Sequence, residues 1–342
     1  MPDEAVSQAR AARLYADSLV WDQHGCLALR PDESSIDQLE LYREAGVDHI
    51  SINVGMDITS TGDVFRIVAA FRHGIAMRSD RFCVATTVGD VDRARESGRL
   101  AVTFDLEGTE PLDGDIAVLE AFYELGVRTI LIAYNRANRA GGGCLDEPAG
   151  GLTAKGREIV REMNRLGVIV DATHCSRETT FDLFELSEQP VVFSHSIPLR
   201  VKDHHRNISD DQMRACAATG GVVGINGVGI FLGENDASTQ AFARAVESAV
   251  EIVGPEHVGI GLDYVFDLEE LETYLHAHRN TFPAGGGYTE YGRPRFVSPL
   301  QLSELTAALV DRGFGEDDVR AILGENFRRV AAAVWHERKL VD

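Results

Sequence analysis

Short apolar runs alternate along the chain with longer amphipathic segments. The short runs are rich in β-branched residues, which favours strands, and the longer ones have the spacing of helices. The strand-like runs are 18–24, 49–54, 101–106, 128–133, 168–173, 190–194, 221–226 and 258–262. Eight such runs are the number in a (β/α)8 TIM barrel, in which intervening helices make the strands parallel. The pattern therefore predicts the α/β class and this barrel.

A ninth run, 82–86, competes for a place in the predicted barrel. The alternative for this run is a side hairpin with the strand-like segment that follows it.

Helical signals occur between the strand-like runs. Ile159, Val160 and Met163 recur at helical spacing within 156–166, and Ser209 followed three residues later by Gln212 is a capping-box pattern. The first 18 residues read as a polar, alanine-rich helix.

The length of 342 residues and a hydrophobic content of 44% suit one barrel of this kind. We therefore expect a single domain over residues 1–342. Residues 264–298 are aromatic and follow the last strand, which predicts a loop insertion at the C-terminal face of the barrel. Such a segment favours a lid or a subunit contact over a linker.

The formal net charge of −21, without any basic run, argues against nucleic acid as a partner. The N-terminal segment lacks the pattern of a secretory signal, and no apolar stretch is long enough to span a bilayer, so no membrane partner is expected. Five scattered cysteines without a CxxC pair favour a reducing, cytoplasmic location.

Several chemically competent side chains stand at the ends of strand-like runs, and a barrel gathers such ends on one face. His24 and Cys26 stand two residues apart at the end of the first run, so both side chains are expected to point the same way. Imidazole and thiolate both bind zinc. The alternative is that the cysteine is a small buried apolar residue.

Glu107 ends an apolar run, and a buried carboxylate is costly unless it is paired or bound to metal. Asp105 shares its strand face. A bridging role between two metal ions is one interpretation, and a buried ion pair with an arginine is the other.

His174 and His195 follow consecutive strand-like runs, and together with Glu107 they form a three-ligand set that leaves a coordination position open, as catalytic zinc requires. Asp263 follows the last run. Its possible roles are general base beside a metal-bound water and helix cap.

From about Ser18 to Val330 the sequence resembles the renal or membrane dipeptidase family of the amidohydrolase-like barrels. The resemblance is carried by GLTAKGREIVREMNRLGVIVDATHCS, PVVFSHS, DHHRNISDDQMRACAATGGVVGIN, EHVGIGLDY and GENFRRV, which occur in the family's order.

The resemblance implies specific roles. Glu107 would bridge two zinc ions, His174 and His195 would complete one site, and His24 would belong to the other. Asp263 would shuttle the proton of a metal-bound hydroxide. Arg206 would bind the terminal carboxylate of the substrate, although a surface arginine beside a helix start is the alternative. The family also implies a homodimer.

Two positions depart from the family pattern. Cys26 stands where the family has Asp, and Tyr134 stands where it has the His that contacts the scissile carbonyl oxygen. A thiolate retains a second metal only after losing its proton, so one or two zinc ions per chain remain open. The hydroxyl of Tyr134 is a candidate substitute for the missing imidazole and hence a substrate-binding residue.

The sequence thus predicts a metallohydrolase, dipeptidase-like, that cleaves an amide bond in a small carboxylate-bearing substrate. One alternative is a divergent mononuclear amidohydrolase acting on a non-dipeptide amide or lactam. Another is a barrel that has lost catalysis and serves only to bind.

Overall fold

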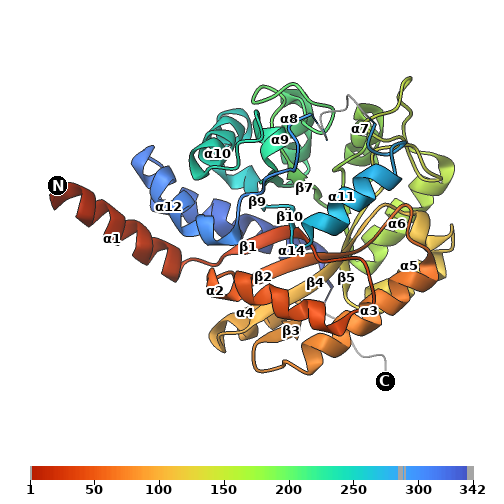
Figure 1. Ribbon diagram of the computed structural model, residues 1–342. Coiled ribbons are helices and arrows are strands. Elements are labelled where there is room, and N and C mark those ends of the chain that lie inside the picture. The colour runs from red at the N-terminus through yellow and green to blue at the C-terminus, as the bar shows by residue number, and fades with distance from the viewer. Residues whose placement is uncertain (1, 284–287, 289, 337–342) are drawn as a thin grey trace.

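The computed structural model describes residues 2–283, 288 and 290–336, and within these ranges eight parallel strands close a barrel (Figure 1). The barrel strands are β1 (Trp21–Cys26), β2 (His49–Met56), β4 (Leu100–Glu107), β5 (Val127–Leu131), β6 (Ile169–Asp171), β7 (Val191–Ser196), β8 (Val223–Asn226) and β9 (Val258–Gly261). They pair in this order, and pairing of Asp22 with Ile260 joins β1 to β9. The predicted TIM barrel is confirmed.

Two further short strands extend the barrel sheet. β3 (Phe82–Val84) is the ninth predicted run, and it pairs in parallel with the start of β4, with Phe82 opposite Leu100. The hairpin interpretation was wrong, because α4 (Val88–Glu96) lies between the two strands and returns the chain so that they run in the same direction. β10 (Tyr264–Val265) pairs in parallel with the end of β1.

Helices connect and surround the strands (Figure 1). Besides α4 they are α1 (Pro2–Asp17), α2 (Glu40–Glu44), α3 (Thr61–Ala76), α5 (Ile116–Glu124), α6 (Ala154–Leu166), α7 (Arg177–Leu186), α8 (Asp210–Ala218), α9 (Gly229–Leu232), α10 (Thr239–Val253), α11 (Leu268–Ala277), α12 (Leu302–Asp311), α13 (Glu316–Arg320) and α14 (Asn326–Val334). Short 3-10 turns are η1 (Glu33–Leu39), η2 (Glu110–Leu112), η3 (Pro255–His257) and η4 (Pro299–Gln301), and the π-helical η5 (Ala321–Glu325) links α13 to α14.

The predicted helical signals correspond to observed helices. The apolar face of α6 buries Ile159, Val160 and Met163, as their spacing requires. Ser209 precedes α8, and the side chain of Gln212 accepts a hydrogen bond of 3.1 Å from its backbone N–H. The polar N-terminal segment forms α1, which lies beside α12 (Figure 1).

Two glycines allow the backbones of β7, β8 and β9 to approach each other closely. A Cβ atom on Gly261 would lie 1.9 Å from the carbonyl oxygen of Ser194, and one on Gly224 would lie 2.1 Å from the same atom. No side chain fits at such distances, so glycine is required at both positions. This close packing fixes the backbone directly beside His195, which follows Ser194 on β7.

The segment predicted as an insertion, 264–298, lies next to the barrel mouth in its described part. It contains β10 beside β1 and the helix α11, and Phe296 forms an isolated antiparallel bridge with Val228, which follows β8. Part of this segment is therefore helical rather than loop. The single-domain organisation over 1–342 stays a prediction. Across the described residues, no helix is both long and apolar enough to cross a membrane.

Candidate metal centre

The barrel brings together the side chains that the sequence singled out at its strand ends. Three overlapping groups have ligand atoms that all lie within 4.8 Å of one another. The groups are His24, Cys26 and Glu107; His24, His195 and Asp263; and Glu107, His174 and His195. Residues separated by up to 239 positions along the chain thus surround one point, as the C-terminal face of a TIM barrel allows.

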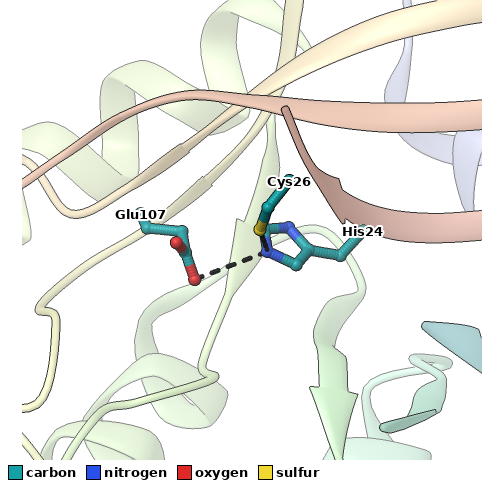
Figure 2. A group of neighbouring side chains, drawn as sticks. All are labelled: His24, Cys26 and Glu107. Atoms are coloured by element: carbon teal, nitrogen blue, oxygen red, sulfur yellow. Dashed lines mark hydrogen bonds and ion pairs between the residues drawn. The ribbon is translucent and has the colours of Figure 1, made fainter. Parts of the chain in front are cut away.

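Glu107 lies at the centre of this cluster. Its Oε1 atom is 3.3 Å from Nε2 of His174, 3.5 Å from Nε2 of His195 and 3.5 Å from Nε2 of His24 (Figure 2 shows the last contact). Its other oxygen, Oε2, accepts a hydrogen bond of 2.8 Å from the side-chain amide of Asn53. One carboxylate oxygen therefore faces three imidazole nitrogens, while the second is held in place from behind.

Hydrogen bonds on the far side of two imidazoles fix which ring nitrogen faces the cluster. The Asn135 side-chain amide donates to the insertion, so its Oδ1 is left to accept from Nδ1 of His174 at 2.7 Å. The hydroxyl of Ser194 donates to Asp171, so its oxygen accepts from Nδ1 of His195 at 2.8 Å. Both imidazoles then carry their proton on Nδ1 and direct the lone pair of Nε2 toward Glu107.

The side of the cluster near β1 has a different chemistry. Nε2 of His24 lies 3.4 Å from Sγ of Cys26, as Figure 2 illustrates. Nδ1 of the same ring lies 3.2 Å from Oδ1 of Asp105. Sγ of Cys26 is also 3.7 Å from Oδ1 of Asp263. Burial raises the pKa of the Cys26 thiol well above its ordinary value, with the carboxylates of Asp263 and Glu107 acting in the same direction. Without a bound metal ion, this cysteine is therefore a neutral thiol.

The charges of the buried cluster call for a cation. Burial raises the pKa of Glu107 to about 8, and the neighbouring carboxylates Asp263 and Asp105 add to that shift. Burial by itself would lower the pKa of His24, yet Asp105, Cys26 and Glu107 together raise it well above the ordinary value. In the protein alone, a protonated His24 therefore supplies the positive charge between these carboxylates.

The two remaining imidazoles behave in the opposite way. Burial lowers the pKa of both His174 and His195 well below the usual range, and the positive charges of Arg206 and His24 lower it further. Both are neutral at physiological pH, which is the state in which an imidazole binds a metal.

Asp263 lies between β9 and β10, at the edge of the cluster. Its Oδ2 accepts a hydrogen bond of 3.0 Å from Asn226, and its Oδ1 is 3.7 Å from Nε2 of His24. Burial raises its pKa above the ordinary value. Asp263, His174 and Asn135 all have left-handed backbones, with φ of 54°, 65° and 60°. Such strain in residues other than glycine is concentrated at functional sites.

Arg206 is buried in the described structure and not a surface residue, with 3% exposure. One terminal nitrogen donates to the backbone oxygen of His195 at 3.3 Å, and the guanidinium lies 5.5 Å from the ring centre of Phe231. Among the described residues, no hydrogen-bond acceptor reaches its Nε atom. A buried guanidinium with an unused donor is suited to an anionic ligand.

Tyr134 lies against one of the imidazoles of the cluster. Its ring stacks on His174, with a centre distance of 4.1 Å and an interplanar angle of 26°. Its backbone N–H donates to Asp57 at 2.9 Å, and Asp57 also accepts from Asn138. The phenol thus lies beside the imidazole of His174, and both residues line the same cavity.

Sequence reasoning missed the polar residues that hold the cluster from behind. They are Asn53, Asp57, Asn135, Ser194 and Asn226. The available signal was that several of them are polar positions in or just after strands that are otherwise apolar and buried, where an unpaired polar group is costly.

These donors fit a metal. Neutral imidazoles with oriented Nε2 atoms around a carboxylate form the nitrogen and oxygen set of catalytic zinc sites. Among the described residues, the ion-pair partners of Glu107 and Asp105 are histidines and not arginine or lysine, so a metal cation would relieve the repulsion between these carboxylates.

Comparison with known protein families shows to which family of TIM-barrel proteins the chain belongs. The family model for membrane dipeptidase (Peptidase family M19) matches residues 33–276. The chain belongs to the membrane dipeptidase family.

Relatives of this family member share both sequence and fold. The dipeptidase aclJ of Aspergillus oryzae is 28% identical over 296 residues, which cover 84% of this chain and 65% of that protein. An amidohydrolase from Pseudomonas aeruginosa is 29% identical and superposes with a TM-score of 0.84, covering 96% of this chain and 99% of that one.

A metallo peptidase from Rhodobacter sphaeroides, solved with a phosphinate mimic of the dipeptide L-Ala-D-Ala, shares the fold at 20% identity and a TM-score of 0.77, covering 93% of this chain and 100% of that one. The chain spans 42% to 65% of the length of the curated dipeptidases it matches from Schizosaccharomyces pombe, Claviceps purpurea, Aspergillus oryzae and Clonostachys rogersoniana.

Proposed function

We propose that this protein is a metal-dependent hydrolase that cleaves the amide bond of a small carboxylate-bearing substrate, with dipeptides as the first substrate class. The observation that carries this proposal is the contact of one oxygen of Glu107 with three imidazole Nε2 atoms at 3.3 to 3.5 Å. Membership in the membrane dipeptidase family supports it.

Zinc is the proposed metal, one or two ions per chain. Glu107, His174 and His195 would hold one ion, and His24 with Cys26 would hold the second. When bound, such an ion polarises the scissile carbonyl and lowers the pKa of water. Occupation of the second position requires Cys26 to lose its thiol proton, which burial opposes in the protein alone.

The chain's own residues orient the substrate and move the proton. Arg206 would bind the terminal carboxylate through its unused donor. Asp263, whose pKa is raised by burial, would accept the proton of the attacking water and pass it to the leaving amine. The hydroxyl of Tyr134 would donate to the carbonyl oxygen as negative charge develops.

A second candidate is a mononuclear amidohydrolase acting on another amide, such as an N-acyl amino acid or a lactam. The neutral thiol of Cys26 favours it, because a protonated cysteine leaves the second metal position weak. Screening the zinc-loaded protein against dipeptides and against these amides separates the two candidates. A homodimer and a cytoplasmic location stay predictions of the sequence.

Replacement of Asp263 by Asn tests the proposed proton transfer. Asn can keep the hydrogen bond from Asn226 and tolerates the left-handed backbone at this position. We expect dipeptide hydrolysis to fall by about 100-fold or more while bound metal is retained. Asp113→Asn is the matched control, since Asp113 also has a left-handed backbone, with φ of 49°, but lies on the surface. Full turnover in Asp263→Asn would refute the assignment.

A further inference from the structure

Two cavities of different character meet at the candidate active site. The first contains Cys26, Glu107 and Asp263 in its wall, and it measures about 130 Å³. The second, of about 570 Å³, is polar and is lined by Lys202, Asp203 and other hydrophilic residues. His174 and Arg206 belong to the walls of both cavities. The imidazole of His174 and the guanidinium of Arg206 therefore lie at the boundary between the two cavities.

The wall of the first cavity is strongly apolar beyond the ligand cluster. Leu27 and Leu29 follow β1, and Leu271 and Leu275 lie on α11. The pairing of Cys26 with Val265 holds the two segments together at this position. Aromatic side chains complete the wall: Tyr274, Phe282, Tyr288, Phe231 and Phe296. A surface of this composition gains free energy by covering apolar groups of a ligand.

Two carboxylates also reach this cavity, and both form an ion pair with the same arginine. Asp267 and Glu270 lie at the start of α11. Arg30 approaches them through Nη1, at 3.4 Å from Asp267 and 2.8 Å from Glu270. Because both carboxylates already pair with Arg30, a positively charged substrate side chain would have to compete with this arginine for them.

The leucines of the apolar wall and the carboxylate-binding arginine belong to different sectors of the barrel. The leucines are attached to β1 and to the segment after β10, whereas Arg206 follows β7 and contacts the backbone of His195. β8 and β9 separate β7 from β1 in the barrel order. A substrate whose terminal carboxylate is bound by Arg206 thus has its amine half on that side, and its acyl half extends toward the leucines.

We propose that the residue on the acyl side of the scissile bond carries a branched aliphatic or aromatic side chain, which the cavity between Leu27, Leu271 and Tyr274 accommodates. This inference rests on the proposed function and specifies its substrate class. A leucine or phenylalanine side chain would contact the apolar wall of this cavity, whereas a glycine would leave that wall without contacts.

A panel of dipeptides with a constant amine half tests the inference. The zinc-loaded wild-type protein is assayed with five substrates: Leu-Ala, Phe-Ala, Gly-Ala, Asp-Ala and Lys-Ala. Each is tested with L-alanine and with D-alanine, so that stereochemistry at the amine half does not decide the result. We expect kcat/KM for the leucine and phenylalanine substrates to exceed that for glycine by about 10- to 100-fold, with aspartate and lysine no better than glycine.

The outcomes distinguish a failure of the proposed substrate preference from a failure of the proposed function. Hydrolysis of all members at similar rates, or a preference for aspartate or lysine, overturns this inference and leaves the proposed function intact. Absence of hydrolysis throughout the panel overturns the proposed function, and the inference with it.

A variant of the cavity wall provides a second measurement. In Leu271→Ala we expect the ratio of kcat/KM for Leu-Ala to that for Gly-Ala to fall by about 10-fold, because the removed side chain no longer contacts the substrate. Leu300→Ala is the matched control, since Leu300 is 50% exposed and lies outside the cavity. An unchanged ratio in folded Leu271→Ala, confirmed by circular dichroism, contradicts the role of this wall.

Discussion

Oδ1 of Asn135 lies 2.7 Å from Nδ1 of His174, and the same amide donates to Thr281 and Tyr288 in the segment beside the barrel mouth. One side chain thus connects a proposed metal ligand to a segment that also lines the cavity. Because its amide protons are used by the insertion, its oxygen is left to accept from the imidazole. This arrangement orients His174 before any metal binds.

Removal of the Asn135 side chain should weaken metal binding. In Asn135→Gly, which suits the left-handed backbone, we expect zinc affinity to fall by about 10- to 100-fold, as is usual when the outer partner of a metal-bound imidazole is lost. Asn135→Asp retains the accepting oxygen, so its zinc affinity should fall much less than that of Asn135→Gly. Competition with a chelator of known affinity measures the effect, and equal affinities for all three proteins would exclude this role.

The eight barrel strands could be predicted because each is a short β-branched run, whereas the contacts behind the ligands depend on register. Asn53 reaches Glu107 because β2 and β4 pair with His49 opposite Ala101. Nothing local in either strand determines that offset. The same limit applies to β3, where the apolar run was recognised but its direction relative to β4 was fixed by the intervening helix.

The residues of the candidate metal centre could be predicted as a set because they all lie at or just after the ends of strands. Their protonation could not be predicted, since it follows from burial and from neighbours on other strands. Cys26 illustrates this, because its raised thiol pKa results from burial and from carboxylates distant in the sequence.

Whether the protein binds one or two metal ions per chain depends on Cys26. If its thiolate holds a second ion, wild-type protein purified under reducing conditions should contain two zinc ions per chain and Cys26→Ala only one. Cys26→Asp supplies a carboxylate without the need to remove a thiol proton and should bind the second ion at least as well. Elemental analysis measures all three. One ion in each protein would assign the site to Glu107, His174 and His195 alone.

Gly261 should tolerate no side chain. In Gly261→Ala the added Cβ meets the backbone oxygen of Ser194, and a rigid backbone cannot move away without displacing β7. We expect a loss of stability of about 1 to 3 kcal/mol or more, together with weaker zinc binding, because His195 lies next to the clash. Denaturant unfolding and metal titration test this. Wild-type stability in the variant would show that the strands can separate freely.

Asp48 should make stability depend on pH far from the active site. Burial raises its pKa to about 6, although a backbone N–H and Arg95 oppose the shift. The folded protein therefore binds this proton more tightly than the unfolded chain, so the contribution of Asp48 to stability falls as pH rises from about 4 to about 6.

Asp48→Asn removes that dependence. The variant should gain stability relative to wild type as pH rises through this window, by a difference on the order of 3 kcal/mol for a shift of two pKa units. Urea unfolding at a series of pH values measures it. Parallel curves for the two proteins would show that Asp48 titrates normally.

The central claim is that the cluster around Glu107 uses a metal to hydrolyse a dipeptide. The most direct measurement is the initial rate of Leu-Ala hydrolysis before metal removal, after removal by a chelator, and after addition of zinc. The account predicts that activity is lost with the metal and returns with zinc. Hydrolysis that persists in metal-free protein, or its absence from protein shown to contain zinc, would contradict it.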